Sequence, residues 1–291
     1  MTQLPLKAQK RITSDLSELA KNESELNENG IYWYIDEDNI REIFVVIRGQ
    51  DDTPYANVPF LFKFVYPDNY PLSPPNGTFC TSDGQTRFNP NLYVGGKICL
   101  SILGTWSGPS WTPVMTTKTI IMSIIALVMT NEPLRNEPGW ENAIKNEIDE
   151  YNTVVEFASL RYGILEQLSN CQLCFQPLLE KMIDRFKKDY PKIMDRIGKN
   201  IEKYRGVDFV RPRYGSHAKI DYIKLRDDMR EFGRKHGLEV VIEEPVLIAE
   251  TQINPKLSPA ANYEVGLEVN WEGFNYVVKI NKSGKKYWRK N

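Results

Sequence analysis

The sequence predicts an α+β fold. One helical pattern at the N-terminus is followed by three runs of branched and aromatic residues, separated by short polar stretches. Consecutive strands joined by short turns pair antiparallel, so these runs indicate a meander, and the longer patterns after them are helical. With 291 residues, the chain is long enough for one large domain or two modest ones. We expect a core over 1–167, a helical extension over 168–237 and a β-rich tail over 238–291.

The first helix is predicted from a stripe of apolar residues. Ala8, Ile12, Leu16 and Leu19 recur three or four positions apart, which places them on one face of an α-helix. The polar stretch Asn22–Gly30 follows and is expected to be a loop between this helix and the sheet.

Four strands are expected next. The runs Ile31–Ile35 and Ile43–Arg48 are rich in aromatic and branched residues, and Pro59–Val65 places three phenylalanines on one face. Asn76–Thr81 is a candidate fourth strand, and Cys80 within it is interpreted as a buried, inert thiol. The strands fit a meander, and nothing in them requires chemistry.

Helical spacing dominates the chain after the sheet. The predicted helices cover Thr116–Thr130, Glu141–Gln167, Pro177–Tyr190, a separate segment around Met194–Ile201, and Tyr222–Phe232. The first of these is rich in isoleucine and fits a buried central helix. The others carry apolar residues on one face and suit helices that pack against a core.

The last part of the chain changes character. Leu238–Ile242 and Val246–Ile248 look like strands, and Val265–Ile280 alternates apolar with polar residues around Glu272-Gly273, which is a hairpin pattern. The basic residues of Lys282–Lys290 are expected to form a solvated end.

Composition and charge exclude several classes of protein. A formal net charge of −1 and a pI of about 6.2 give no case for a nucleic-acid partner. The longest largely apolar run, Ile120–Met129, is far shorter than the ~20 residues that a membrane span requires. Four cysteines make no convincing disulfide framework in a chain of this size, and no leader is recognisable. We therefore expect a reducing compartment, cytoplasmic or nuclear, and no membrane partner.

Cys99 is the main candidate for a reactive side chain. It follows two glycines, and Asn91 stands eight positions upstream. The thiolate is the nucleophilic form of cysteine, and a histidine base usually helps to produce it. The chain's two histidines, His217 and His236, lie far along the sequence, which disfavours a cysteine hydrolase. An asparagine that donates to a developing oxyanion suits acyl transfer from a substrate that arrives already activated.

Several motifs around Cys99 carry a family resemblance. In register with it stand Tyr66–Pro71 with Pro74-Pro75, Pro90-Asn91, Gly96–Leu100, Trp111–Pro113 and Asn136–Trp140. In this order and spacing they resemble the active-site region of ubiquitin-conjugating enzymes, and most of all the Z-type subgroup of large conjugating enzymes. The resemblance covers about residues 6–167 and implies the ubiquitin-conjugating fold, an antiparallel meander sheet flanked by helices. One departure is that Asn89 stands where most of the family has a loop-shaping histidine.

The resemblance implies a transferase. Cys99 would accept ubiquitin or a ubiquitin-like modifier as a thioester in an ATP-dependent cascade. It would then pass the modifier to a lysine amine of a protein substrate to form an isopeptide bond, directly or with a ligase. Asn91 would hold the loop and stabilise the oxyanion. Glu137, ahead of Pro138, would position the lysine and help it lose its proton; a solvated surface carboxylate is the alternative interpretation.

The resemblance also implies two partner surfaces. The N-terminal helix would present Lys7, Lys10 and Arg11 to the ubiquitin-activating enzyme, while a solvated basic face explains the same residues without a partner. A ubiquitin ligase would dock on Leu72, Pro113 and Val114, for which ordinary loop packing is the alternative.

Other functions remain open at this point. A non-catalytic ubiquitin-binding module on the same fold would lack the cysteine, which this chain keeps at position 99. A hydrolase of ubiquitin-like tags would need His217 or His236 folded against Cys99. A zinc site at Cys171 and Cys174 would lack two ligands, so a packed turn is favoured and no metal or cofactor is expected.

Overall fold

The structure is a computed structural model that describes residues 4–238, 268–271, 274–281 and 284–290. It divides into two compact units, Met1–Leu238 and Glu239–Asn291. The first unit contains the four-stranded sheet and all the helices of the described residues, and the second contains a small three-stranded sheet. The α+β class predicted from the sequence is confirmed.

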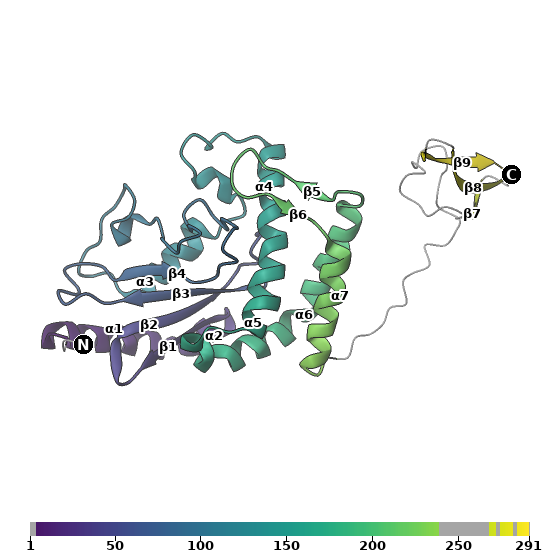
Figure 1. The fold of residues 1–291 in the computed structure, drawn as a ribbon. Coiled ribbons are helices and arrows are strands. Elements are labelled where there is room, and N and C mark those ends of the chain that lie inside the picture. Colours follow the sequence, from purple (N-terminus) through teal and green to yellow (C-terminus); the bar gives the residue numbers. More distant parts are fainter. Residues whose placement is uncertain (1–3, 239–267, 272–273, 282–283, 291) are drawn as a thin grey trace. The chain divides into compact units, whose positions relative to one another are not determined.

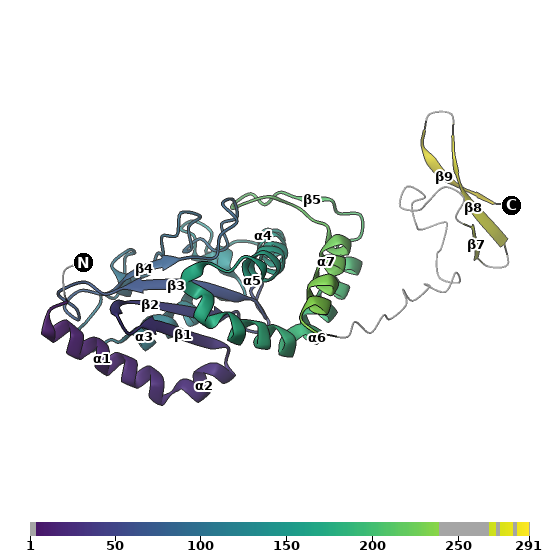
Figure 2. The same ribbon diagram turned by 60° about the horizontal axis from the view of Figure 1, so that its bottom comes forward.

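Two helices precede the sheet. Helix α1 (Leu6–Lys21) buries the predicted apolar stripe. The expected loop over Asn22–Gly30 is wrong, because most of this segment forms a second helix, α2 (Glu23–Glu28). Its only buried residue is Leu26, and one apolar position in six residues cannot reveal a helical period. Figures 1 and 2 show α1 at the opposite side of the sheet from α4 and α7.

The sheet is the predicted antiparallel meander. Its strands are β1 (Ile31–Asp36), β2 (Asn39–Arg48), β3 (Pro59–Val65) and β4 (Asn76–Phe79), hydrogen-bonded in chain order. Apolar residues of β2 lie opposite phenylalanines of β3, in the pairs Ile43 with Phe64, Val45 with Phe62 and Ile47 with Phe60. All of these side chains are fully buried, so the shared register of the two strands builds the centre of the core. The fourth strand ends at Phe79 rather than Thr81.

The central helix follows the segment that contains Cys99. Short helical turns occur at Ser101–Leu103 and Pro133–Asn136. Between them, α3 (Thr117–Ser123) continues as a wider helical turn, Ile124–Val128. The hydroxyl of Thr119 accepts a hydrogen bond from the N–H of Thr116 at the start of α3.

The next helix begins four residues later than the sequence pattern indicates. Helix α4 spans Lys145–Ala158 and continues through wide turns (Ser159–Glu166) into α5 (Gln167–Ser169). Upstream, the N–H of Trp140 donates to the backbone carbonyl of Glu137, and the N–H of Ala143 donates to the backbone carbonyl of Trp140. Each of these N–H groups bonds to a carbonyl three positions earlier, whereas an α-helix bonds four positions back. Turns therefore replace the start of the helix that was predicted from Glu141.

The helical extension consists of a short turn, two long helices and a small hairpin. The elements are Leu173–Leu178, α6 (Leu179–Lys203), β5 (Phe209–Val210), β6 (Ala218–Lys219) and α7 (Tyr222–Lys235). The sequence predicts two helices where α6 is one continuous helix that includes Pro191. The prediction is wrong because Phe186, Ile193 and Ile197 belong to one buried stripe across the proline. The β5–β6 hairpin was not predicted.

The extension packs into the same compact unit as the core. Arg48 of β2 is buried and its Nε lies 2.6 Å from Oδ2 of Asp189 on α6. Arg185 of α6 donates to the same oxygen at 2.8 Å. Burial alone would lower the pKa of Arg48, but its bonds to Asp189 and Asp51 outweigh burial and raise it. The extension expected to separate at residue 168 is therefore joined to the sheet by a buried ion pair.

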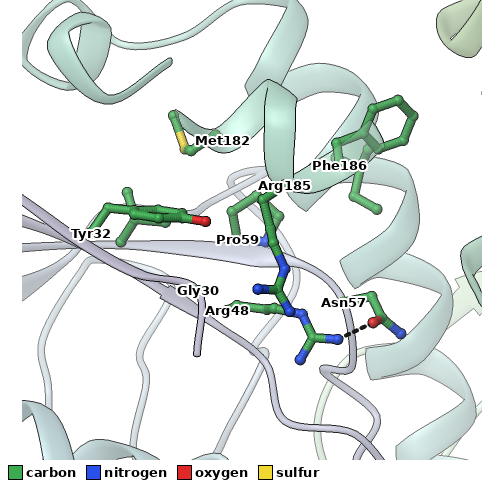
Figure 3. A pocket seen from close by; sticks show the side chains of 10 residues that line it. Gly30, Tyr32, Arg48, Asn57, Pro59, Met182, Arg185 and Phe186 are labelled. Atoms are coloured by element: carbon green, nitrogen blue, oxygen red, sulfur yellow. Dashed lines mark hydrogen bonds between the residues drawn. The ribbon is translucent and has the colours of Figure 1, made fainter. Parts of the chain in front are cut away.

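Figure 3 shows the space at this junction. Arg48 and Arg185 extend between the strands and the helix, beside Met182 and Phe186 of α6 and Asn57, which accepts a hydrogen bond from Arg48. The enclosed cavity has a volume of about 10 Å³. This is close to the space of a single water molecule, so the junction is a packed interface and no ligand pocket.

The second unit is a three-stranded antiparallel sheet in the order β7-β8-β9. Strands β7 (Glu268–Trp271) and β8 (Phe274–Ile280) pair with Trp271 opposite Phe274, in the predicted hairpin register. The basic end forms strand β9 (Lys286–Lys290), in which Arg289 and Lys290 are exposed, so the end expected to be solvated is part of a sheet. The strands predicted at residues 239–242 and 246–248 lie outside the described residues.

Candidate active site

Cys99 lies in a loop that is closed by hydrogen bonds to Asn91. The N–H of Cys99 donates to the carbonyl of Asn91 at 2.8 Å. In return, Nδ2 of Asn91 donates to the carbonyl of Cys99 at 2.7 Å. The eight-residue spacing seen in the sequence therefore places the asparagine amide against the cysteine backbone.

Asn89 fixes the start of this loop. Its side chain is fully buried. The amide Nδ2 donates to the hydroxyl of Tyr55 at 2.8 Å and to the carbonyl of Val128 at 2.7 Å. Oδ1 accepts from the N–H of Asn91 at 2.7 Å. Asn89, which stands where the family resemblance leads us to expect a histidine, thus joins the Asn91 loop to the end of the central helix.

Thr105 holds the backbone on both sides of Cys99. Its hydroxyl donates to the carbonyl of Ile98 at 2.6 Å and accepts from the N–H of Leu100 at 2.9 Å. Gly96 lets the loop lie close to β4. Its φ is +87°, and a Cβ at this position would lie 2.9 Å from Cγ2 of Thr78. A side chain at this position would be strained and would push the loop away from β4.

The reactive group itself is shielded. Cys99 is 1% exposed, although a carrier cysteine must meet the carbonyl of its donor. An acyl donor can therefore reach the sulfur only after side chains around the loop move aside.

Glu137 lies in a network that reaches across the chain. The hydroxyl of Tyr214, in the extension, donates to its Oε2 at 2.7 Å. Nη2 of Arg87 lies 3.9 Å from the same oxygen. Nη2 of Arg87 also donates to the carbonyl of Pro90 at 2.6 Å. The candidate carboxylate is thus linked to the segment that carries Asn91.

The comparison with protein families shows which family the chain belongs to. A family described as "Ubiquitin-conjugating enzyme" matches residues 11–159, which is about half of the chain and includes Asn91, Cys99 and Glu137.

The chain belongs to the ubiquitin-conjugating enzyme family.

Relatives in animals agree with this assignment. "Ubiquitin-conjugating enzyme E2 Z" of Xenopus tropicalis is 32% identical over 73% of this chain and 69% of its own length. The Homo sapiens protein of the same name is 37% identical over 55% of this chain and 46% of its own length. "Probable ubiquitin-conjugating enzyme protein 17" of Caenorhabditis elegans is 43% identical over 59% of this chain, a match that spans 25% of its own length. The Z-type subgroup expected from the motifs is confirmed.

Basic residues lie on α1, as the sequence led us to expect. Lys7 and Lys10 are exposed. Arg11 instead donates to the carbonyls of Pro113 and Met115, the latter at 2.7 Å, and pairs with Asp15 at 2.7 Å. Arg11 therefore holds the loop after Trp111 against the helix.

The predicted ligase-binding residues lie on two neighbouring loops. Leu72 is 74% exposed and Val114 is 85% exposed. Nε1 of Trp111 donates to the carbonyl of Pro71 at 2.7 Å, which joins the loops. Pro113 and Val114 also line an open groove whose other wall is α1, with Lys10 and Arg11. Two of the residues predicted for each partner thus line one groove.

The remaining candidates lie elsewhere. The His217 ring packs 6.0 Å from that of Phe209, and the His236 ring packs 4.5 Å from that of Phe232; neither contact involves Cys99. Burial raises the pKa of Cys80 to about 11. No cluster of three or more potential metal ligands occurs among the residues that the structure describes. Within the same residues, no helix is both long and apolar enough to cross a bilayer.

Sequence reasoning missed three residues of this site. Thr105 lies between the motifs Gly96–Leu100 and Trp111–Pro113, in a segment for which the sequence suggests no role. Arg87 and Tyr214 carry no motif, and Tyr214 lies 77 positions after the carboxylate that it contacts. No local pattern could have connected them, because the contact depends on where the extension folds back.

Proposed function

We propose that this chain carries ubiquitin or a ubiquitin-like modifier as a thioester on Cys99 and transfers it to a lysine amine. The observation that carries the proposal is the pair of reciprocal hydrogen bonds between Asn91 and the Cys99 backbone. These bonds hold an amide donor against the backbone of Cys99 in a chain of this family, which supports the proposal.

The first step is an exchange of thioesters. The thiolate of Cys99 attacks the carbonyl carbon of a modifier held as a thioester by the activating enzyme. A new C–S bond forms, the old one breaks, and the thiolate of the activating enzyme leaves. The donor arrives activated, so a strong base beside Cys99 is not required.

The second step transfers the acyl group to nitrogen. A lysine amine attacks the thioester carbon, the oxygen becomes an oxyanion, and the Cys99 thiolate leaves as the amide forms. A side-chain amide has two N–H donors. Asn91 can keep one on the carbonyl of Cys99 and direct the other at the oxyanion. Glu137 accepts a hydrogen bond from the amine and helps to remove its proton.

Residues on α1 and on two neighbouring loops indicate where the partner enzymes bind. Lys7, Lys10 and Arg11 contribute to binding of the activating enzyme, and Leu72, Pro113 and Val114 to binding of a ligase. Because Lys10, Arg11, Pro113 and Val114 line one groove, the two partners compete, and charging and ligase binding alternate. Four unpaired cysteines support a reducing compartment, cytoplasmic or nuclear.

The test is a charging assay with purified activating enzyme, ATP and ubiquitin, analysed on gels with and without reductant. The wild-type chain should form an adduct that reductant removes. Cys99→Ala should form none, whereas Cys174→Ala, which changes an exposed cysteine, should charge like the wild type. A reductant-sensitive adduct on Cys99→Ala would refute the proposal.

A further inference from the structure

The loop between β5 and β6 contacts the core with four consecutive residues. Arg213 pairs with Glu147 of α4 at 2.8 Å. Tyr214 donates to Glu137. Ser216 accepts from the N–H of Arg87 at 2.9 Å and donates to the carbonyl of Gln85 at 3.1 Å. A surface loop that merely connects two strands would not make such a series of contacts.

Gly215 allows this approach. Its φ is +87°, and a Cβ at this position would lie 2.7 Å from Cε2 of Tyr151. Tyr151 is buried, and its hydroxyl donates to the carbonyl of Arg87 at 3.2 Å. The loop backbone therefore lies directly on a core side chain, and only glycine fits there without strain.

The ring of Tyr214 is fixed from two sides. Its centroid lies 5.9 Å from that of Trp140 and 6.1 Å from that of Tyr151. Burial and the hydrogen bond to Glu137 raise the pKa of Tyr214 well above its usual value. The hydroxyl therefore keeps its proton at neutral pH and donates a hydrogen bond to the carboxylate.

The carboxylate is held through one of its two oxygens. Both Tyr214 and Arg87 contact Oε2 of Glu137. Arg87 is itself placed by its bond to Pro90 and by stacking on Tyr93, with 4.0 Å from its guanidinium carbon to the ring centroid. The Glu137 side chain remains about one-quarter exposed, so the carboxylate is partly open to solvent.

We propose that Tyr214 is a positioning residue for acyl transfer. Its hydroxyl, together with Arg87, fixes Oε2 of Glu137 so that Oε1 accepts the hydrogen bond of the incoming lysine. The inference rests on the role given to Glu137 in the proposed function. It adds that the extension, which lies beyond the matched family region, supplies part of the site.

The rival explanation is that the Tyr214 hydroxyl only anchors the extension. The chain offers a matched control for this, because the hydroxyl of Tyr204 also joins the extension to the core, 2.7 Å from Oγ1 of Thr153 on α4. Tyr214→Phe and Tyr204→Phe each remove one hydroxyl and keep the ring.

The experiment uses the full chain charged with ubiquitin and follows single-turnover discharge. Two nucleophiles are compared at neutral pH: free lysine, whose amine is protonated, and hydroxylamine, which is neutral and needs no carboxylate. Tyr214→Phe should lower the lysine-to-hydroxylamine rate ratio about tenfold, as expected for the loss of a hydrogen bond to a charged group. Glu137→Gln should lower the ratio at least as much, and Tyr204→Phe should leave it unchanged.

The double variant Tyr214→Phe/Glu137→Gln provides the decisive comparison. If the hydroxyl acts through the carboxylate, the double variant should be no slower with lysine than Glu137→Gln alone. The inference would be overturned if Tyr214→Phe slowed both nucleophiles equally or kept the wild-type rate ratio. If Glu137→Gln still slowed discharge to lysine in that case, the proposed function would stand. A wild-type ratio for Glu137→Gln would instead remove the assigned role of the carboxylate and the inference with it.

Discussion

At the scale of single residues, the two asparagines of the active-site loop have different tasks. Asn89 is buried and uses three hydrogen bonds to join the loop to Tyr55 and Val128. Asn91 is only partly buried and keeps one donor near Cys99. The first asparagine should therefore contribute mainly to stability and the second mainly to the reaction.

This difference can be measured with two alanine variants. Asn89→Ala should lower the free energy of unfolding by about 1–3 kcal/mol, because it leaves buried partners unsatisfied. Asn91→Ala should charge Cys99 normally but slow discharge to lysine, by about 10²-fold if its donor acts like a known oxyanion donor. Denaturant unfolding and timed discharge are the measurements. Equal loss of charging and discharge in Asn91→Ala would show that this residue also serves the fold.

The sequence could predict that Asn91 and Cys99 lie together, because their contact depends on a short, fixed spacing within one loop. It could not show that Cys99 is almost completely buried, since shielding depends on neighbouring loops. The contact of Tyr214 with Glu137 was equally inaccessible, because two segments 77 positions apart meet only after the extension has packed.

At the scale of elements, prediction succeeded where periodicity was long and failed where it was short or interrupted. Strand β3 has its predicted bounds, since alternating phenylalanines leave one choice of face. Helix α2 was missed because a single buried leucine carries no period. Helix α6 was divided in two because Pro191 suggests a break, whereas burial of its continuous apolar face outweighs the missing backbone bond.

Helix α6 also provides the strongest element-level prediction. Asp189→Ala should lower the free energy of unfolding by about 1.5–3 kcal/mol, since it removes the buried carboxylate shared by Arg48 and Arg185 and leaves Arg48 only the half-exposed Asp51. Asp195→Ala is the matched control on the same helix: its pair with Lys199 is exposed at 75% and 60%, and such pairs contribute at most about 1 kcal/mol.

Denaturant unfolding of the two variants beside the wild type measures this difference. An Asp189→Ala variant as stable as Asp195→Ala would mean that the junction between α6 and the sheet tolerates the loss of its buried carboxylate, contrary to the prediction.

At the scale of the whole molecule, the chain consists of two compact units whose boundary follows Leu238. The contacts of Asn91, Cys99, Glu137 and Tyr214 described above all lie within the first unit. The helical extension belongs to that unit as well, so truncation at residue 168 and truncation at residue 238 should have opposite results.

A chain ending at Leu238 should unfold at the temperature of the first unit in the full protein, accept ubiquitin and discharge it to free lysine at the full-length rate. A chain ending at Gln167 should be unstable, because Arg48 loses Asp189 and the hydrophobic core loses α6. Circular dichroism with heating and timed charging test both. A folded Leu238 truncation that cannot be charged would place part of the machinery in the second unit.

The buried pair of Arg48 and Asp189 has a consequence for synthesis. The two residues are 141 positions apart, and a chain made at roughly 5–20 residues per second needs on the order of 7–28 s to go from one to the other. During that interval the only carboxylate of the pair network available to the guanidinium is that of Asp51, which is half exposed, so the guanidinium must stay near water. A nascent chain that already contains Asn91, Cys99 and Glu137 therefore still lacks a closed core. Cys99, the proposed carrier, is therefore made well before the core that contains it can close.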